Sequence, residues 1–233
     1  MKRSILLIAL LLTLWVSAQQ NYYTIYNFTV APEEAQTVYQ LTNDYYTKHK
    51  PAGVTVALWE NHFNDSGNNF THSIVFLGSL DAIGSMYASD GGDTWSLFLT
   101  RLNQHIKDGF SSGTGHVLST YGDTSGDYPV QRYYILDVEN GAKYIAAFNK
   151  FQSTLPAGVY VATGVISAGN SPEGETNWVI AGYKDFKTAI GGTNSLLSGA
   201  ALDARNKAWD EFLATNGGVR MVRSGLRVRL GNW

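Results

Sequence analysis

The 233-residue sequence contains no cysteine, only five prolines and few charged residues. The absence of cysteine excludes disulfides, thiolate catalysis, iron–sulfur clusters and cysteine-based zinc sites. Charged residues make up 15% of the chain, whereas an average soluble domain has about 25%. The formal net charge is only −2, so nucleic acid is not an expected partner. Hydrophobic residues make up 44%, which excludes an intrinsically disordered chain.

The first eighteen residues have the pattern of a secretory signal peptide. Lys2 and Arg3 precede a mostly apolar run over 4–16, and residues 16–18 match the small-residue cleavage signature. The apolar run is too short to span about 30 Å of hydrocarbon at about 1.5 Å per residue. We therefore expect cleavage after Ala18 and a secreted or periplasmic protein with no membrane span. Cleavage would remove two cations and change the formal net charge to −4.

Two short matches indicate an internal repeat. The tetrapeptide Pro-Ala-Gly-Val at 51–54 recurs at 156–159, and the run 75–81 corresponds to 179–185 at almost the same offset. We expect four parts: a signal peptide at 1–18, a first repeat at 19–122, a turn-rich linker at 123–130 and a second repeat at 131–233.

Each half is predicted to have the order β-α-β-β-α-β. The first half has predicted strands over 22–30, 53–61, 72–79 and 115–121, a helix over 32–49, and a helical stretch over 80–107 that breaks at 90–93. The second half has predicted strands over 132–138, 158–166, 178–183 and 219–230, with helices over 141–154 and 198–215. This order is the ferredoxin-like motif, whose sheet carries helices on one face only.

The uncovered face of each sheet needs a partner, and two such sheets packed face to face would close a barrel. The chain therefore resembles the dimeric α/β-barrel superfamily, which includes the antibiotic-biosynthesis-monooxygenase-like proteins. The run Gly-Tyr-Lys-Asp-Phe at 182–186 is similar to the junction between third strand and helix that is common in that superfamily. The resemblance implies an α+β fold, with two tandem ferredoxin-like repeats fused as a single-chain α/β barrel.

Strand alternation predicts which side chains lie between the sheets. It places Trp59 in the lumen, and the repeat alignment adds Ile74, Phe76, Trp178 and Ile180. An apolar, aromatic lumen suits a small-molecule pocket. The leading hypothesis is therefore an exported protein that binds a small apolar or aromatic molecule between the two sheets, with no catalysis assigned. A packed protein-interaction or structural module stays open as an alternative, with an unidentified protein partner.

All five histidines lie in the first half, and three of them, His72, His105 and His116, are candidate site residues. Haem-degrading members of the superfamily use an asparagine on the first strand together with a tryptophan and a haem-ligating histidine on a helix. The resemblance maps these roles onto Asn27, Trp95 and His105. It implies haem as a candidate cofactor and a haem-dependent or monooxygenase-like enzyme as a further alternative. No histidine pair has the close spacing of a metal site.

Four arginines gather near the C-terminus, at 220, 223, 227 and 229. They are expected either to be solvated positions on the last strand or to form an anion-binding or surface-binding site. The sequence has no nucleophile elbow, no Walker loop and no Rossmann fingerprint. The sequence thus predicts the architecture and an apolar pocket, and leaves the activity open.

Overall fold

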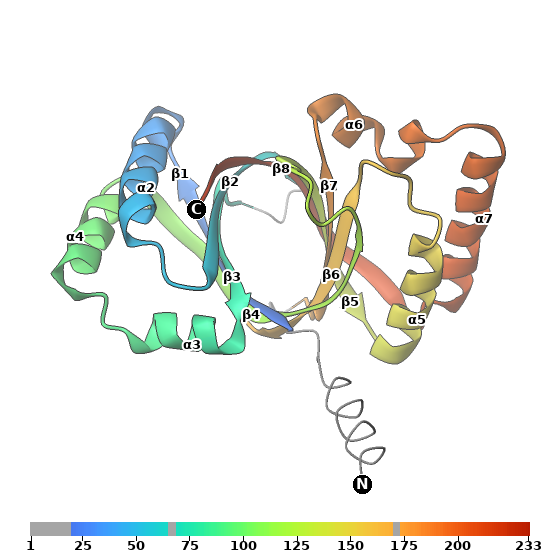
Figure 1. Cartoon of the computed structure of the whole chain (residues 1–233), viewed down its shortest axis with the longest axis horizontal. Coiled ribbons are helices and arrows are strands. Elements are labelled where there is room, and N and C mark those ends of the chain that lie inside the picture. The colour runs from blue at the N-terminus through green and yellow to red at the C-terminus, as the bar shows by residue number, and fades with distance from the viewer. Residues whose placement is uncertain (1–19, 65–68, 170–172) are drawn as a thin grey trace, which may run out of the picture.

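The computed structural model describes residues 20–64, 69–169 and 173–233 (Figure 1). The predicted signal peptide at 1–18 lies outside these described residues. The strands are β1 (Asn21–Val30), β2 (Val54–Asn64), β3 (His72–Ser79), β4 (Ile106–Gly122), β5 (Val130–Val138), β6 (Tyr160–Ala168), β7 (Asn177–Tyr183) and β8 (Val219–Asn232). The helices are α2 (Ala35–His49), α3 (Leu80–Ala88), α4 (Gly92–Asn103), α5 (Gly141–Gln152), α6 (Phe186–Gly191) and α7 (Gly199–Thr215), with short 3₁₀ turns η1 (Pro32–Glu34) and η2 (Thr193–Leu196).

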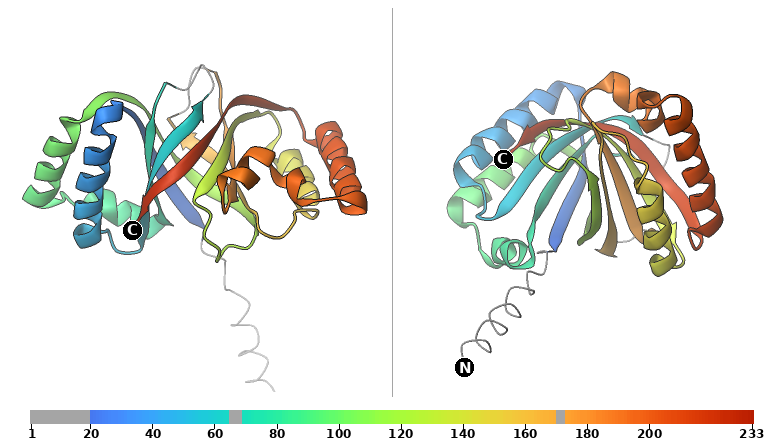
Figure 2. Two further views of the ribbon diagram at one scale, coloured as in Figure 1. Left: turned by 90° about the horizontal axis from the view of Figure 1, so that it is seen from above. Right: turned by 45° about the vertical axis from the view of Figure 1, so that its right-hand side comes forward.

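The eight strands form one closed antiparallel barrel in the order β1-β3-β2-β8-β5-β7-β6-β4. Pairing of β2 with β8 and of β4 with β6 joins the first four strands to the last four. Helices α2, α3 and α4 cover one side of the barrel, and α5, α6 and α7 cover the opposite side (Figures 1 and 2). The predicted α+β class and barrel are confirmed. No helix among the described residues has the length and apolarity needed to cross a membrane.

Local sequence signals explain most element boundaries on the α2–α4 side. Pro32 stands at the start of η1, where its missing N–H is not needed. The Ser79 side chain accepts a hydrogen bond from the Ala82 backbone N–H at 3.1 Å and so caps α3. Gly91 then opens α4 with a φ of +65°, a left-handed conformation that favours glycine. These signals explain why the predicted break near residue 90 separates two helices.

Two boundaries differ from the prediction. Helix α4 ends at Asn103, not near 107, and β4 begins at Ile106 and runs for 17 residues instead of starting at 115. The segment 106–114 is rich in glycine and serine, which favoured a turn, but it is held as a strand by its ladder with β1. Tertiary pairing therefore overrides local propensity in this segment. The short helix α6 was not predicted.

Two apolar cores lie on the outer faces of the barrel, under the helices. One core combines β1, β2 and β3 with α2, α3 and α4, and includes Phe28, Val38, Tyr46, Val56, Leu58, Phe76 and Phe98. The other core combines β5, β6, β7 and β8 with α5, α6 and α7, and includes Tyr144, Phe148, Phe151, Val161, Val179, Tyr183 and Phe212. The alternate side chains of each strand consequently face the barrel interior.

The predicted lumen positions of Ile74 and Phe76 are wrong. Phe76 lies opposite Val56 and packs in the core under the helices, whereas Trp178 lies opposite Gly164 on the interior face. The two sequence matches had offsets of 105 and 104 residues. A one-residue difference in alignment moves a side chain to the other face of a sheet, which explains the error. The predicted interior positions of Trp59 and Trp178 are confirmed.

Candidate ligand-binding cleft

A cleft of about 1,080 Å³ lies outside the barrel, between the helix-facing side of the sheet and helices α2, α3 and α4. Nine aromatic residues line it: Tyr26, Phe28, Tyr45, Tyr46, Phe76, Tyr87, Trp95, Phe98 and Phe110. Aliphatic side chains, including Ile74, Met86 and Leu99, complete the walls, and no Asp, Glu, Lys or Arg lines the cleft among the described residues. The cleft is therefore an apolar and uncharged environment.

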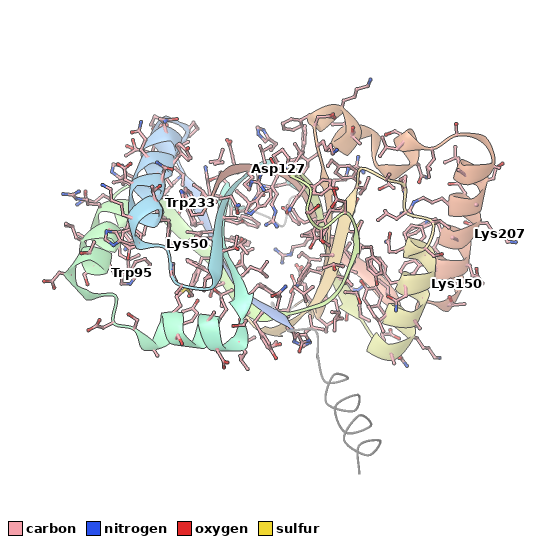
Figure 3. All side chains as sticks on the ribbon, viewed as in Figure 1. Lys50, Trp95, Asp127, Lys150, Lys207 and Trp233 are labelled. Atoms are coloured by element: carbon pink, nitrogen blue, oxygen red, sulfur yellow. The ribbon has the colours of Figure 1, made fainter. Side chains whose placement is uncertain are left out.

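Ring contacts between α2 and α4 build the outer wall of the cleft. Tyr45 stacks on Phe98 with ring centroids 4.3 Å apart and planes 15° apart. Trp95, which Figure 3 labels on α4, lies 5.6 Å from the Tyr45 ring and 5.5 Å from Phe98. Helix α3 lies below α2 and α4 in Figure 1. Residues of all three helices line the cleft.

The polar residues of the cleft are four tyrosines together with serines, asparagines and His49. The Tyr26 hydroxyl from β1 and the Tyr87 hydroxyl from α3 are 2.7 Å apart and hydrogen-bonded. Burial raises the pKa of Tyr26 above its ordinary value, and the bond to Tyr87 raises it further. Burial also raises the pKa of Tyr46, as do the nearby Tyr45, Tyr87 and Tyr26 hydroxyls. The Tyr26 and Tyr46 hydroxyls therefore stay protonated and neutral near pH 7.

His49 is the one histidine that lines the cleft among the described residues. It is the last residue of α2. Its ring lies 5.1 Å from the ring of Tyr45. His49 is exposed, so it belongs to the rim of the cleft and not to its floor.

The three residues predicted for haem binding are not assembled into one site. Asn27 binds Ser73 and Ser111 through its amide, on the face of the sheet opposite to Tyr26 and Phe28. Trp95 does line the cleft. His105 lies in the turn after α4 and not on the helix, and its Nδ1 is 2.7 Å from a carboxylate oxygen of Glu34.

The two other candidate histidines lie elsewhere. His72 is buried, stacks on Phe28 with ring centroids 6.0 Å apart, and its Nδ1 is 2.8 Å from the Thr71 hydroxyl. Burial lowers the pKa of His72. The His116 ring lies 5.7 Å from that of Tyr22. No group of three or more histidine and carboxylate side chains that could hold a metal occurs in the described part of the chain.

Of the eight predicted site residues, Phe76 and Trp95 thus meet in the cleft. Asn27 also borders the cleft, although its amide is bonded to serines on the other face of the sheet. Trp59 and Trp178 lie inside the barrel instead. Sequence reasoning missed the tyrosines, above all Tyr26 and Tyr87. The signal for Tyr26 was available, since it alternates with Asn27 and shares the face of Phe28. Nothing local pairs Tyr26 with Tyr87, 61 residues away.

Comparison with solved structures shows that this barrel is a known fold. A candidate monooxygenase from Lactobacillus acidophilus is similar over 91% of this chain and 95% of its own, with a TM-score of 0.61 and 12% identity. An anthrone oxidase-like protein covers 93% of this chain and 94% of its own, with a TM-score of 0.56 and 10% identity. A mutant chlorite dismutase from Candidatus Nitrospira defluvii covers 90% of this chain and 91% of its own, with a TM-score of 0.55 and 11% identity.

These similarities place the chain in the ferredoxin-like α+β barrel fold that such proteins share. At these identities they show the fold alone, because one fold carries many functions. No family model and no curated protein matches the sequence.

Proposed function

We propose that the cleft between the sheet and helices α2, α3 and α4 binds a neutral, planar aromatic molecule that carries a hydroxyl or carbonyl group. The observation that carries this proposal is the lining of the cleft, with nine aromatic residues and, in the described part of the chain, no Asp, Glu, Lys or Arg. Binding pockets for small molecules typically have volumes of about 300–1,000 Å³ and a few polar groups among apolar walls. The cleft, at about 1,080 Å³, has room for a ligand of several fused rings.

The charge of the ligand follows from the charge of the walls. A buried ion without a counter-charge is strongly disfavoured, so an apolar cleft without ionic side chains selects a neutral molecule. Flat rings suit the walls because aromatic side chains offer faces and edges for stacking. The Tyr26–Tyr87 pair supplies the hydroxyls that would bind an oxygen of the ligand.

This proposal keeps the predicted class of ligand but moves its position from between the sheets to the outer face of one sheet. Inside the barrel, Trp59 packs against the Arg227 guanidinium, and Trp178 packs edge-on against Tyr23. The aromatic rings of the interior therefore already have packing partners. The open cleft also makes ligand binding the stronger proposal over a solidly packed interaction module.

The residues of the cleft do not fit haem in the predicted manner. His105, the expected axial ligand, is bonded to Glu34, and Asn27 is bonded to two serines on the other face of the sheet. The described residues that line the cleft also include no Lys or Arg for the propionates of haem. We therefore assign no haem chemistry and no catalytic step to this chain.

We also infer that the barrel arose by tandem duplication and that the mature protein acts outside the cytoplasm. The order β4-β1-β3-β2 of the first four strands is repeated as β8-β5-β7-β6 by the last four, which supports the duplication. The pattern over 1–18 supports export. N-terminal sequencing of the protein from its own host tests export, which requires a chain that begins at Gln19.

Isothermal titration calorimetry with 1,8-dihydroxyanthraquinone tests the binding proposal. The affinity of the wild type is compared with that of a variant in which a bulky side chain fills the cleft. Ser85 is an exposed residue of α3 that lines the cleft, so Ser85→Trp should fill the cleft without disturbing the core. Ser96→Trp, on the exposed surface of α4, is the matched control. We expect micromolar binding to the wild type and the control, and at least tenfold weaker binding to Ser85→Trp. Equal affinity of all three proteins would contradict the proposal.

A further inference from the structure

Three arginines of β8 project from one face of the strand into the barrel interior. They are Arg223, Arg227 and Arg229, which alternate along β8 and lie opposite interior positions of β2 and β5. Two of them are ion-paired. Arg223 binds Glu173 at 2.8 Å and Glu175 at 3.1 Å. Arg229 pairs with Asp127, which Figure 3 labels above the barrel.

Arg227, between the other two, has only neutral partners among the described residues. Its Nε and one Nη2 hydrogen both go to the Gln131 side-chain oxygen, at 3.2 and 2.9 Å. Its guanidinium lies 4.6 Å from the ring centre of Trp59 and 5.8 Å from that of Tyr133. No carboxylate of the described chain lies within ion-pair distance of it.

This arrangement leaves a buried positive charge without a counter-charge. Arg227 is only 9% exposed, and an ion in such a place costs several kcal/mol unless it is paired. Burial lowers the pKa of Arg227 to about 10, so the guanidinium is still charged at pH 7. A neutral amide and two rings provide only part of the stabilisation that an anion would give.

The unused donors of Arg227 point to what would complete the site. A guanidinium has five N–H groups, and the bonds to Gln131 use two of them. The two hydrogens of Nη1 and one of Nη2 have no partner in the described chain, and Nη1 is not sealed from solvent. The free Nη1–Nη2 edge matches the two oxygens of a carboxylate, the geometry of a bidentate pair.

We infer that the barrel interior binds a small carboxylate through the free edge of Arg227, with Trp59 beneath the guanidinium. This site lies on the opposite face of the sheet from the aromatic cleft and differs from it in chemistry, since it selects an anion. The inference does not depend on the proposed function. It assigns one of the C-terminal arginines to an anion site and leaves Arg223 and Arg229 as its ion-paired neighbours.

Thermal unfolding of the mature protein in acetate, at constant ionic strength, tests this inference. The wild-type Tm should rise with the logarithm of the acetate concentration once this exceeds Kd, by roughly 5–10 °C at a hundredfold excess over Kd. Arg227→Met should abolish this rise without lowering Tm in the absence of acetate, because the apolar side chain removes an unpaired charge. Arg220→Met is the matched control, since Arg220 lies on the same strand but is exposed and pairs with Asp137.

Two outcomes would overturn the inference. A rise of Tm with acetate that persists in Arg227→Met would place the anion elsewhere. If the Tm of the wild type does not rise with acetate, Arg227 has only a structural role and is held by its ring contacts. Formate, benzoate, phosphate and chloride are the comparison anions, and a response to chloride but to none of the carboxylates would overturn the assignment of ligand class.

Fluorescence quenching gives a second readout that uses the wild-type fold. Iodide should quench Trp59 because it collects at Arg227, and acetate should relieve that quenching by competition, while quenching by neutral acrylamide stays unchanged. The Trp59→Phe variant identifies the contribution of this residue. Iodide quenching that acetate does not relieve would contradict the inference even if Arg227→Met fails to fold.

Discussion

The hydroxyl groups of Tyr26 on β1 and Tyr87 on α3, two residues that line the cleft, are joined by a hydrogen bond of 2.7 Å. Both tyrosines also line a second hollow of about 380 Å³ beside the cleft, with Ser112 shared between the two. The pair therefore forms a polar partition between two adjoining hollows. It offers a ligand both a donor and an acceptor beside the aromatic rings of the cleft.

Removing one hydroxyl of this pair should weaken the binding of ligands that carry oxygen and leave the binding of pure hydrocarbons unchanged. Tyr87→Phe deletes a hydrogen-bonding group but keeps the ring, so binding of 1,8-dihydroxyanthraquinone should weaken about five- to tenfold, the effect of one hydrogen bond worth about 1 kcal/mol. Binding of the hydrocarbon phenanthrene should be unchanged. Fluorescence titration of both probes measures the difference, and equal losses for the two would show that Tyr87 acts only through packing.

Protonation of His72 should make the fold less stable in acid. Burial holds the pKa of His72 below its ordinary value near 6.5. As the pH falls below that value, the unfolded chain takes up a proton that the folded chain does not, so the free energy of unfolding decreases by at most about 1.4 kcal/mol per pH unit. His72→Gln should remove this slope. The exposed His62→Gln is the control.

Urea unfolding of the three proteins between pH 4.5 and 7.5 measures the His72 effect. The difference between wild type and His72→Gln should be nearly constant above pH 7 and should fall steadily below pH 6.5. A difference that does not vary with pH would mean that His72 titrates alike in the folded and unfolded chains.

Two glycine substitutions should have opposite effects on stability. A Cβ at Gly115 would lie 1.9 Å from the Val165 backbone oxygen, at the β4–β6 pairing that closes the barrel. Gly115→Ala should therefore destabilise the protein by at least about 2 kcal/mol. Gly84 lies in α3 with no atom near the position of an added Cβ, and Gly84→Ala should stabilise by about 0.5–1 kcal/mol. Chemical denaturation reports both, and a loss of stability in both variants would refute the contrast.

His105 should prove dispensable for ligand binding. Its contact with Glu34 is partly exposed, and such ion pairs contribute about 0–1 kcal/mol. His105→Ala should therefore lower stability only slightly and leave the affinity for 1,8-dihydroxyanthraquinone unchanged in calorimetry. A variant that loses ligand binding while remaining folded would restore His105 as a candidate site residue.

Much of the architecture could be predicted because its signals are local. Pro32 and Pro51 bracket α2, Gly91 separates α3 from α4, and period-two patterns mark most strands. Local sequence signals do not predict the structure of segments whose conformation depends on tertiary contacts. The first residues of β4 are strand only because β1 pairs with them, and α6 is a single short helix capped by Asp185.

The position of the site was harder to predict than the fold. Strand alternation correctly separates Asn27 from Tyr26 and Phe28, but the sequence does not say which face is hollow. The hollow depends on how α2, α3 and α4 pack over the sheet, a long-range property. The two repeat alignments differ by one residue, and this difference decides whether Phe76 is assigned to the inner or the outer face. Only the observed strand pairing shows that Phe76 lies on the outer face.

Quenching of tryptophan fluorescence by bound 1,8-dihydroxyanthraquinone tests the position of the ligand site most directly. Trp95 lines the cleft, Trp59 faces the barrel interior and Trp209 lies on α7 on the opposite side. We predict that Trp95→Phe removes most of the quenching, while Trp59→Phe and Trp209→Phe retain it. Loss of the quenching in Trp59→Phe, with Trp95→Phe unaffected, would place the ligand between the sheets and contradict the account.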